Sequence, residues 1–419
     1  MPRSVHVIGV GRTDFRRNLL KEGKTIGHLI AECGRAAITD AGIEPGDITS
    51  GVVGNFASGL FTRQLHLGAY LVGIDEALRG MPTVHVEAAC ASGGVAVLTA
   101  AQQIIGGLHE VVLVVGVEQQ KTMSPADGSE VLAAAGDYAG ERPLFGDFMF
   151  PKLFARIARI YTERHGLREE DLARVSAKNH AHARLNPLAQ MRDSGLTFQE
   201  ACTESVNNRR FAPPLKLTDC SQITDGAASL VLCSDDFARG LAGKPGRRRP
   251  GVRLRGYGHA TDRVALEKKD APDFAIARSA AAQAYRMAGL SATDVQAAEL
   301  HDCFSISEVL SYEILGFAER GKGAGLLSSG VTALPSVREK LDIDGHADGR
   351  PAPVVNPGGG LMGDGHPVGA TGVRQVVEAY AHLTDNAGSR QVKDVRRYLT
   401  FNIGGSFTTS VAMIWERTQ

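Results

Sequence analysis

Near its C-terminal end the chain reads NPGGGLMGDGHPVGATG over residues 356–372. Seven of these seventeen positions are glycine, and a single histidine, His366, stands in the middle with Pro367 directly behind it. Glycine at this density lets the backbone pass close to a ligand or to another strand. We interpret His366 as a general base held at such a close approach. A glycine-rich turn whose histidine only packs is the alternative that this segment leaves open.

A cysteine with small neighbours stands at a strand-to-helix junction early in the chain. Residues 84–94 read VHVEAACASGG, so that a strand leads to Cys90 and a helix is expected over about 91–105. A thiol at a helix N-terminus faces unpaired N–H groups and the positive end of the helix dipole, and both favour the thiolate. We therefore expect a lowered pKa for Cys90 and a role as nucleophile. A buried cysteine that only packs is the alternative.

Two further segments carry groups that suit the same chemistry. Residues 299–308 read ELHDCFSISE, where His301 and Cys303 point the same way if the preceding strand continues through them. Two ligands are too few for a metal and no partner spacing exists, so no metal site is predicted. Residues 400–407 read TFNIGGSF, a break between two apolar strands at which bare glycine N–H groups could form an oxyanion hole.

The order of elements predicts a duplicated α/β fold. Short β-branched runs alternate with alanine-rich helical periods along most of the chain. The sequence AGIEPGDI at 41–48 returns 247 residues later as AGLSATDV at 288–295, and each copy joins a helix to a strand. We predict two duplicated halves, 1–237 and 252–419.

Two stretches interrupt this pattern. Residues from about 119 to 217 are more polar and mostly helical, and we expect them to be an insertion that caps one face. Residues 238–251 are rich in Gly, Pro and Arg and are expected to link the halves. His180 and His182 are two apart on a probable helix, where their side chains diverge, so we expect surface residues rather than metal ligands.

The composition excludes several classes of protein. The 46 Lys+Arg residues balance 46 Asp+Glu residues, which argues against a protein that binds nucleic acid or an anionic membrane surface. The longest aliphatic stretch, Val111 to Val117, is far shorter than the ~20 residues of a membrane span. Six cysteines without a C-x-x-C pair make neither a disulfide scaffold nor a zinc ribbon. We expect a reduced, cytoplasmic enzyme.

Taken together and in this order, the segments resemble the thiolase superfamily over essentially the whole chain. The AACASG sequence around Cys90 resembles the nucleophile motif of that family, and residues 356–372 resemble its glycine-rich histidine motif at nearly every position. Residues 225–228, DGAA, resemble the strand that closes the first half. The resemblance implies the thiolase fold, in which duplicated α/β halves form a layered α-β-α-β-α core with an inserted helical loop domain.

Two departures from ordinary thiolases narrow the resemblance. Ordinary thiolases carry an Asn-Glu motif where this chain has His301-Asp302-Cys303-Phe304, and a second catalytic cysteine where it has Asn402. The combination is similar to the sterol-carrier-protein-2-type thiolases and their bacterial and archaeal relatives. In that branch the cysteine of the His-Asp-Cys-Phe motif takes the second role.

The resemblance implies a reaction in which acyl-CoA and acetyl-CoA give 3-oxoacyl-CoA and CoA, or the reverse thiolysis. It implies that His366 takes the proton of Cys90, whose thiolate is acylated. Cys303 then removes an α-proton from acetyl-CoA, and His301 stabilises the enolate oxygen. The backbone N–H groups of Cys90 and Gly404 hold the tetrahedral oxyanion.

Coenzyme A thioesters are then substrates, and no further cofactor is expected. The candidates for binding coenzyme A are Arg209, Arg210, Lys216 and Ser221. The resemblance also implies lipid metabolism, a homodimer or homotetramer, and, for some relatives, a small zinc-containing OB-fold partner protein.

Three alternatives keep the fold and change the chemistry. A natural-product type of acyltransferase would pass the acyl group to an acceptor other than a CoA thioester. A thiolase-like aldolase or scaffold would have lost Claisen chemistry. A cysteine hydrolase would use only Cys90 and His366. The acyl chain that the enzyme accepts is not predicted.

Overall fold

The structure is a computed structural model of the whole chain, and a defined part of it can be described. The described residues are 3–242, 251–338, 341 and 352–418. The linker expected over 238–251 lies largely outside them, and its first residues belong to helix α9 (Asp235–Ala242). Among the described helices, none combines the length and the apolar character that crossing a membrane requires.

Ten strands of the described residues form one mixed sheet, five from each predicted half. The first five are β1 (Val5–Arg12), β2 (Ser50–Gly54), β3 (Thr83–Val86), β4 (Val111–Gln119) and β7 (Asp225–Ser234). The second five are β8 (Val252–Thr261), β9 (Ala297–Glu299), β10 (Val354–Val355), β11 (Arg397–Gly404) and β12 (Thr409–Arg417). From the β1–β8 junction outward, the orders are β1-β7-β4-β2-β3 and β8-β12-β11-β9-β10. The two orders match strand by strand, so the topology itself is duplicated.

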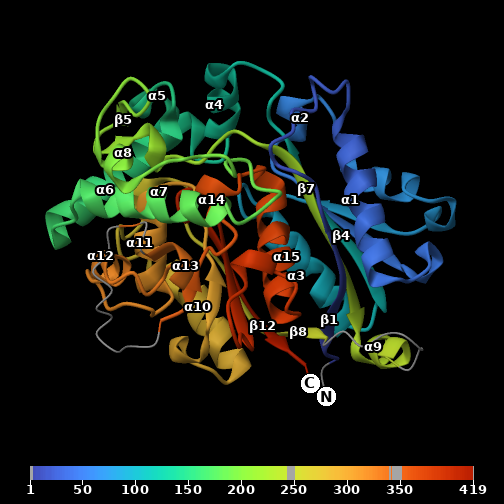
Figure 1. Ribbon diagram of the computed structural model, residues 1–419. Coiled ribbons are helices and arrows are strands. Elements are labelled where there is room, and N and C mark those ends of the chain that lie inside the picture. Colours follow the sequence, from blue (N-terminus) through green and yellow to red (C-terminus); the bar gives the residue numbers. More distant parts are fainter. Residues whose placement is uncertain (1–2, 243–250, 339–340, 342–351, 419) are drawn as a thin grey trace.

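Two equivalent pairs of helices complete the layers. Helix α1 (Ile26–Ala41) packs on β1, β4 and β7, and α10 (Ala275–Ala288) packs on β8 and β12. Helices α3 (Ser92–Ile105) and α15 (Thr371–Leu383) lie side by side between the two halves of the sheet (Figure 1). The predicted α/β fold with duplicated halves is confirmed. We propose the boundaries 1–237 and 252–419 for these halves.

The repeated segments 41–48 and 288–295 begin at equivalent helix ends in the two halves. Helix α1 ends at Gly42 with φ 58° and α10 ends at Gly289 with φ 66°, and these glycines are 247 residues apart. A left-handed residue after a helix is accessible to glycine without steric cost, which accounts for glycine at both ends. Each end leads through a short 3₁₀ turn into the matching strand, β2 or β9.

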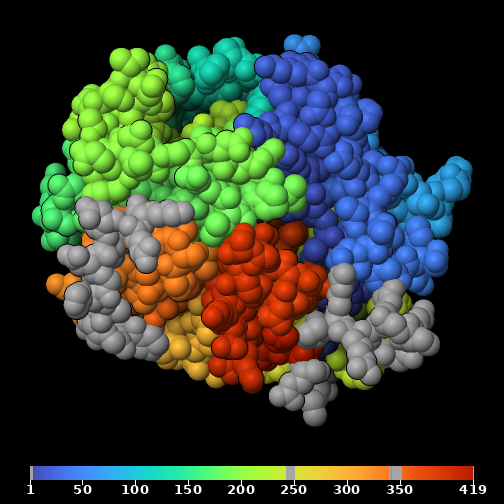
Figure 2. All heavy atoms as spheres, viewed as in Figure 1, coloured from blue at the N-terminus to red at the C-terminus, as the bar shows by residue number. Residues whose placement is uncertain are grey.

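The insertion between β4 and β7 is helical, as predicted, and lies against the C-terminal half in Figure 2. Its elements are α4 (Pro125–Ala133), α5 (Tyr138–Phe145), α6 (Met149–His165), α7 (Glu169–Ala183), α8 (Phe198–Cys202), β5 (Arg210–Ala212) and β6 (Leu215–Lys216). The remaining helices are α2 (Ser58–Phe61), α11 (Ser305–Ile314), α12 (Gly323–Ser328), α13 (Pro335–Arg338) and α14 (Gly360–Gly363).

The prediction that His180 and His182 lie on the surface is wrong. Both are buried, because α7 packs against α14 in the glycine-rich segment. The Nδ1 atom of His182 lies 2.9 Å from the carbonyl oxygen of Asn356, and its Nε2 atom accepts from the backbone N–H of Leu334 at 3.0 Å. The inserted region therefore supports the segment that carries His366.

Candidate active site

Cys90 stands in a tight turn between β3 and α3. The preceding residue, Ala89, has φ 50°, a left-handed conformation that is uncommon for any residue with a Cβ atom. The hydroxyl of Ser92 donates to the carbonyl oxygen of Ala89 at 2.6 Å and accepts from the N–H of Ala88 at 2.9 Å. These bonds hold a strained turn that presents Cys90 directly before the helix.

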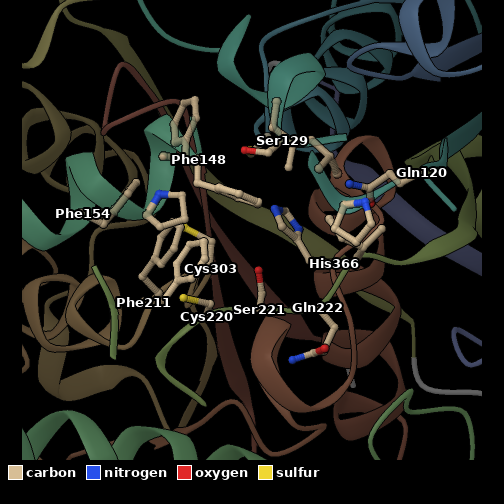
Figure 3. A pocket seen from close by; sticks show the side chains of 18 of the residues that line it. Gln120, Ser129, Phe148, Phe154, Phe211, Cys220, Ser221, Gln222, Cys303 and His366 are labelled. Atoms are coloured by element: carbon tan, nitrogen blue, oxygen red, sulfur yellow. The ribbon is translucent and has the colours of Figure 1, made fainter. Parts of the chain in front are cut away.

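Three loops bring the predicted catalytic groups together. The sulfur of Cys90 and one ring nitrogen each of His301 and His366 all lie within 4.8 Å of one another. The two imidazole rings meet edge to face with centroids 5.1 Å apart. Cys303 lines the same cavity, in which Figure 3 shows it near His366. The thiol and imidazole donors could also ligate a soft metal ion, although the sequence predicted no metal.

Burial sets the protonation of the nucleophile and its neighbour. Burial raises the pKa of Cys90 to about 12, against the effect of N–H groups at its sulfur, so the expected lowering is not found. Burial and then the charge of Arg374 lower the pKa of His366 to about 3. At neutral pH the pair is therefore a thiol beside a neutral imidazole, which is able to accept the thiol proton.

A threonine fixes which nitrogen of His366 is the base. The hydroxyl of Thr371 donates to the carbonyl oxygen of Pro367 at 3.2 Å and lies 2.7 Å from Nδ1 of His366. When this hydroxyl donates its one proton to Pro367, Nδ1 of His366 is the donor in the contact with Thr371. Nε2 is then left with a free lone pair for the proton of Cys90.

The side-chain amide of Asn402 determines which ring nitrogen of His301 carries the proton. Its side-chain oxygen accepts from the N–H of Gly94 at 3.0 Å, which orients the amide. Its Nδ2 atom donates to Nδ1 of His301 and to the carbonyl oxygen of Cys90, both at 3.0 Å. The proton of His301 is therefore on Nε2. In the sequence Asn402 stands only in the place of an absent cysteine, and nothing there reveals this bond.

The glycine pair after β11 lies against the Cys90 turn. The N–H groups of Gly405 and of Cys90 itself face the Cys90 sulfur. A Cβ atom on Gly404 would come within 2.2 Å of the carbonyl oxygen of Ala88, so glycine is needed there for close approach. The structure thus adds Gly405 as a donor, whereas Gly404 allows the strand to reach the site.

Asp302 ties the His-Asp-Cys-Phe segment to the glycine-rich segment. Its carboxylate accepts from the N–H groups of Leu361 and Met362 at 2.7 and 3.3 Å, and from the side chain of Asn179 at 2.7 Å. A Cβ atom on Gly360 would lie 2.3 Å from that carboxylate. Glycine at position 360 therefore allows the segment 356–372 to pack closely around the buried carboxylate of Asp302.

The four candidates for binding coenzyme A are placed differently. Arg209 and Ser221 line the cavity, and the N–H of Ser221 donates to the carbonyl oxygen of Cys303 at 2.9 Å. Arg210 is paired with Glu169 and Glu204 outside the cavity lining. Lys216 is fully buried, with its ammonium group 3.9 Å from Asp219. We carry only Arg209 and Ser221 forward, because buried Lys216 and paired Arg210 do not face the cavity.

Comparison with known proteins gives matches over both halves. Residues 5–196 match the family model described as "Thiolase, N-terminal domain", and residues 258–417 match "Thiolase C-terminal domain-like". The chain is 36% identical over 416 residues to "Acetyl-CoA acetyltransferase" of Methanothermobacter thermautotrophicus, covering 99% of this chain and 100% of that protein. It is 31% identical over 402 residues to "Sterol carrier protein 2" of Gallus gallus, covering 93% and 67%. Among solved structures, "Ltp2-ChsH2(DUF35) aldolase" has a TM-score of 0.78 at 24% identity, covering 100% of this chain and 99% of that chain.

Proposed function

The chain belongs to the thiolase family and is an enzyme of it, and from this premise we propose that it forms and cleaves 3-oxoacyl-CoA through an acyl-Cys90 intermediate. The observation that carries the proposal is the meeting of the Cys90 sulfur with two imidazole nitrogens within 4.8 Å, in a cavity that Cys303 also lines. A nucleophile, a base and a second acid–base group are thereby available to one substrate.

The first step is acylation of Cys90. Nε2 of His366 accepts the thiol proton as the sulfur attacks the thioester carbonyl carbon and the C–S bond forms. The N–H groups of Cys90 and Gly404 stabilise the oxyanion, with the N–H of Gly405, which faces the Cys90 sulfur, as a further candidate donor; one such donor is worth about 3–4 kcal/mol. The bond to the sulfur of coenzyme A then breaks, and the leaving thiolate takes the proton from His366.

The second step forms the carbon–carbon bond. Nε2 of His366 takes the thiol proton of Cys303, the resulting thiolate removes an α-proton from acetyl-CoA, and the N–H at Nε2 of His301 donates to the enolate oxygen. The enolate carbon attacks the acyl carbon, and the bond to the Cys90 sulfur breaks. Thiolysis is the same sequence in reverse.

The side chains of Arg209 and Ser221 are our candidates for contacts to coenzyme A. Arg209 is a cation that can pair with phosphate, and Ser221 can bond to the pantetheine arm. No additional cofactor enters these steps. We carry forward three proposals on the resemblance alone: a role in lipid metabolism, a cytoplasmic location and a small zinc-containing OB-fold partner.

We also propose a homo-oligomer, with β3 at the interface. Strand β3 lies at one edge of the sheet formed by the described residues, paired with β2 on one side. Leu60 and Leu65 nearby in the chain are 57% and 67% exposed. An unpaired strand edge favours pairing with a second copy, and exposed apolar side chains favour an interface. Light scattering after size exclusion should give at least twice the mass of one chain, and a monomer mass would contradict the interface.

Trapping the intermediate tests the proposed reaction. The enzyme is incubated with acetyl-CoA or octanoyl-CoA and digested, and the acyl group should be found by mass spectrometry on Cys90. CoA-dependent thiolysis of 3-oxoacyl-CoA is followed by absorbance. Absence of both the adduct and thiolysis would refute the thiolase reaction. An adduct without thiolysis would favour an acceptor other than a CoA thioester, and carbon–carbon cleavage without an adduct would favour the aldolase alternative.

A further inference from the structure

The cavity above Cys90 is large compared with an acetyl group. Its volume is about 530 Å³, within the roughly 300–1,000 Å³ of pockets that enclose drug-sized ligands. Cys90, Cys303 and His366 all lie on its wall. The acyl group on the Cys90 sulfur and the arm of coenzyme A, whose proposed contacts Arg209 and Ser221 line the same cavity, therefore share this space.

Aromatic and aliphatic side chains make up most of the wall. Phe148 and Phe211 meet edge to face with centroids 4.9 Å apart, and both are only half-buried, so their rings face the cavity (Figure 3). The ring of Phe154 stacks on the ring of Phe304, the residue that follows Cys303, with the ring centroids 4.5 Å apart. Of the lining side chains, Arg209 alone carries a permanent charge.

One part of the cavity wall has few side chains that could form hydrogen bonds with the coenzyme. The pantetheine arm contains amide groups, which lose free energy when they are buried without hydrogen-bond partners. Apart from Ser129, the lining residues from α4 and the start of α6 have apolar side chains: Pro125, Leu132, Phe148, Phe150 and Pro151. This wall is suited to a hydrocarbon rather than to the arm.

Building on the proposed function, we propose that the acyl group carried by Cys90 is a bulky apolar one, such as a medium chain or an aryl group, rather than acetyl. In thiolysis the Cys90 sulfur attacks C3 of the 3-oxoacyl-CoA, and the C2–C3 bond breaks. The electron pair goes to the enolate of acetyl-CoA, which Cys303 protonates. The acyl group, with C3 as its thioester carbonyl carbon, stays on Cys90 in the apolar cavity until the thiol of CoA attacks C3, and the bond to the Cys90 sulfur breaks.

The test is the ratio of kcat/KM for thiolysis of each of two bulky substrates to that of acetoacetyl-CoA. Two buried methylene groups are worth about tenfold in binding, so 3-oxooctanoyl-CoA and 3-oxo-3-phenylpropanoyl-CoA should each exceed acetoacetyl-CoA at least about tenfold. The variant Leu132→Trp narrows the cavity and should lower this ratio about tenfold. The matched variant Leu144→Trp, at a side chain that is 75% exposed and outside the lining, should leave the ratio unchanged.

The outcomes separate this inference from the reaction on which it rests. Thiolysis in which acetoacetyl-CoA equals or exceeds the bulky substrates would overturn the inference and leave the thiolase reaction standing. Absence of thiolysis with every substrate, together with absence of an adduct on Cys90, would overturn both. The wild-type ratio needs no variant, so it decides the question even if Leu132→Trp does not fold.

Discussion

Replacement of Cys303 by alanine should leave Cys90 able to accept an acyl group but slow carbon–carbon bond formation about 10²–10⁴-fold, the usual contribution of a general acid or base. Burial, and then the charge of Cys90, raise the pKa of Cys303 well above its ordinary value. Cys303 is therefore a thiol at rest. It must lose its own proton before it can remove an α-proton, and the neutral imidazole of His366 in the same cavity is the acceptor that we propose.

Two assays on the Cys303→Ala variant separate the steps. Acylation is read as the acyl mass on Cys90, and condensation is read as formation of 3-oxoacyl-CoA. Cys33→Ala is the matched control, because Cys33, like Cys303, is a buried cysteine but lies outside the cavity lining. Condensation by Cys303→Ala at the wild-type rate would show that a different base, with His366 the first candidate, removes the α-proton.

The convergence of the reactive residues on one site could be predicted from the sequence because each of them lies at the end of a recognisable element. Cys90 follows a strand and precedes a helix, His301 and Cys303 follow β9, and His366 precedes α15. In a duplicated α/β fold, equivalent junctions lie at the same edge of the sheet. The strand itself ends at Glu299, so His301 and Cys303 converge from a loop rather than along a continued strand.

What the sequence could not reveal depends on packing between distant segments. The pKa of Cys90 moves opposite to the expectation from the helix N-terminus, because its surroundings bury the thiol and desolvation exceeds the effect of local N–H groups. Asn402 orients His301 across 101 residues of sequence. Lys216 is buried by the fold rather than exposed to the coenzyme. None of these contacts has a local sequence pattern.

Replacement of His366 by asparagine should slow acylation of Cys90 about 10²–10⁴-fold. The side-chain amide can keep a donor near the hydroxyl of Thr371, so the loop is retained while the base at Nε2 is lost. Rapid-quench measurement of the acyl adduct gives the rate of this step. His180→Asn is the matched control, because His180 is a buried histidine bonded to Ser194 at 2.8 Å and lies outside the cavity lining.

The pH dependence of the acylation rate is a second test of the protonation states of Cys90 and His366. With the pKa of His366 lowered to about 3 and that of Cys90 raised to about 12, neither group titrates between these limits. The rate should therefore be flat from about pH 5 to 9 and fall only as His366 is protonated near its lowered pKa, instead of near the ~6.5 of a free histidine. An inflection close to 6.5 in the wild-type enzyme that is lost in His366→Asn would show that substrate binding or solvent restores an ordinary pKa to this imidazole. In that case the base would be neutral only above that inflection, and the neutral thiol–imidazole pair would be the resting state only in that upper pH range.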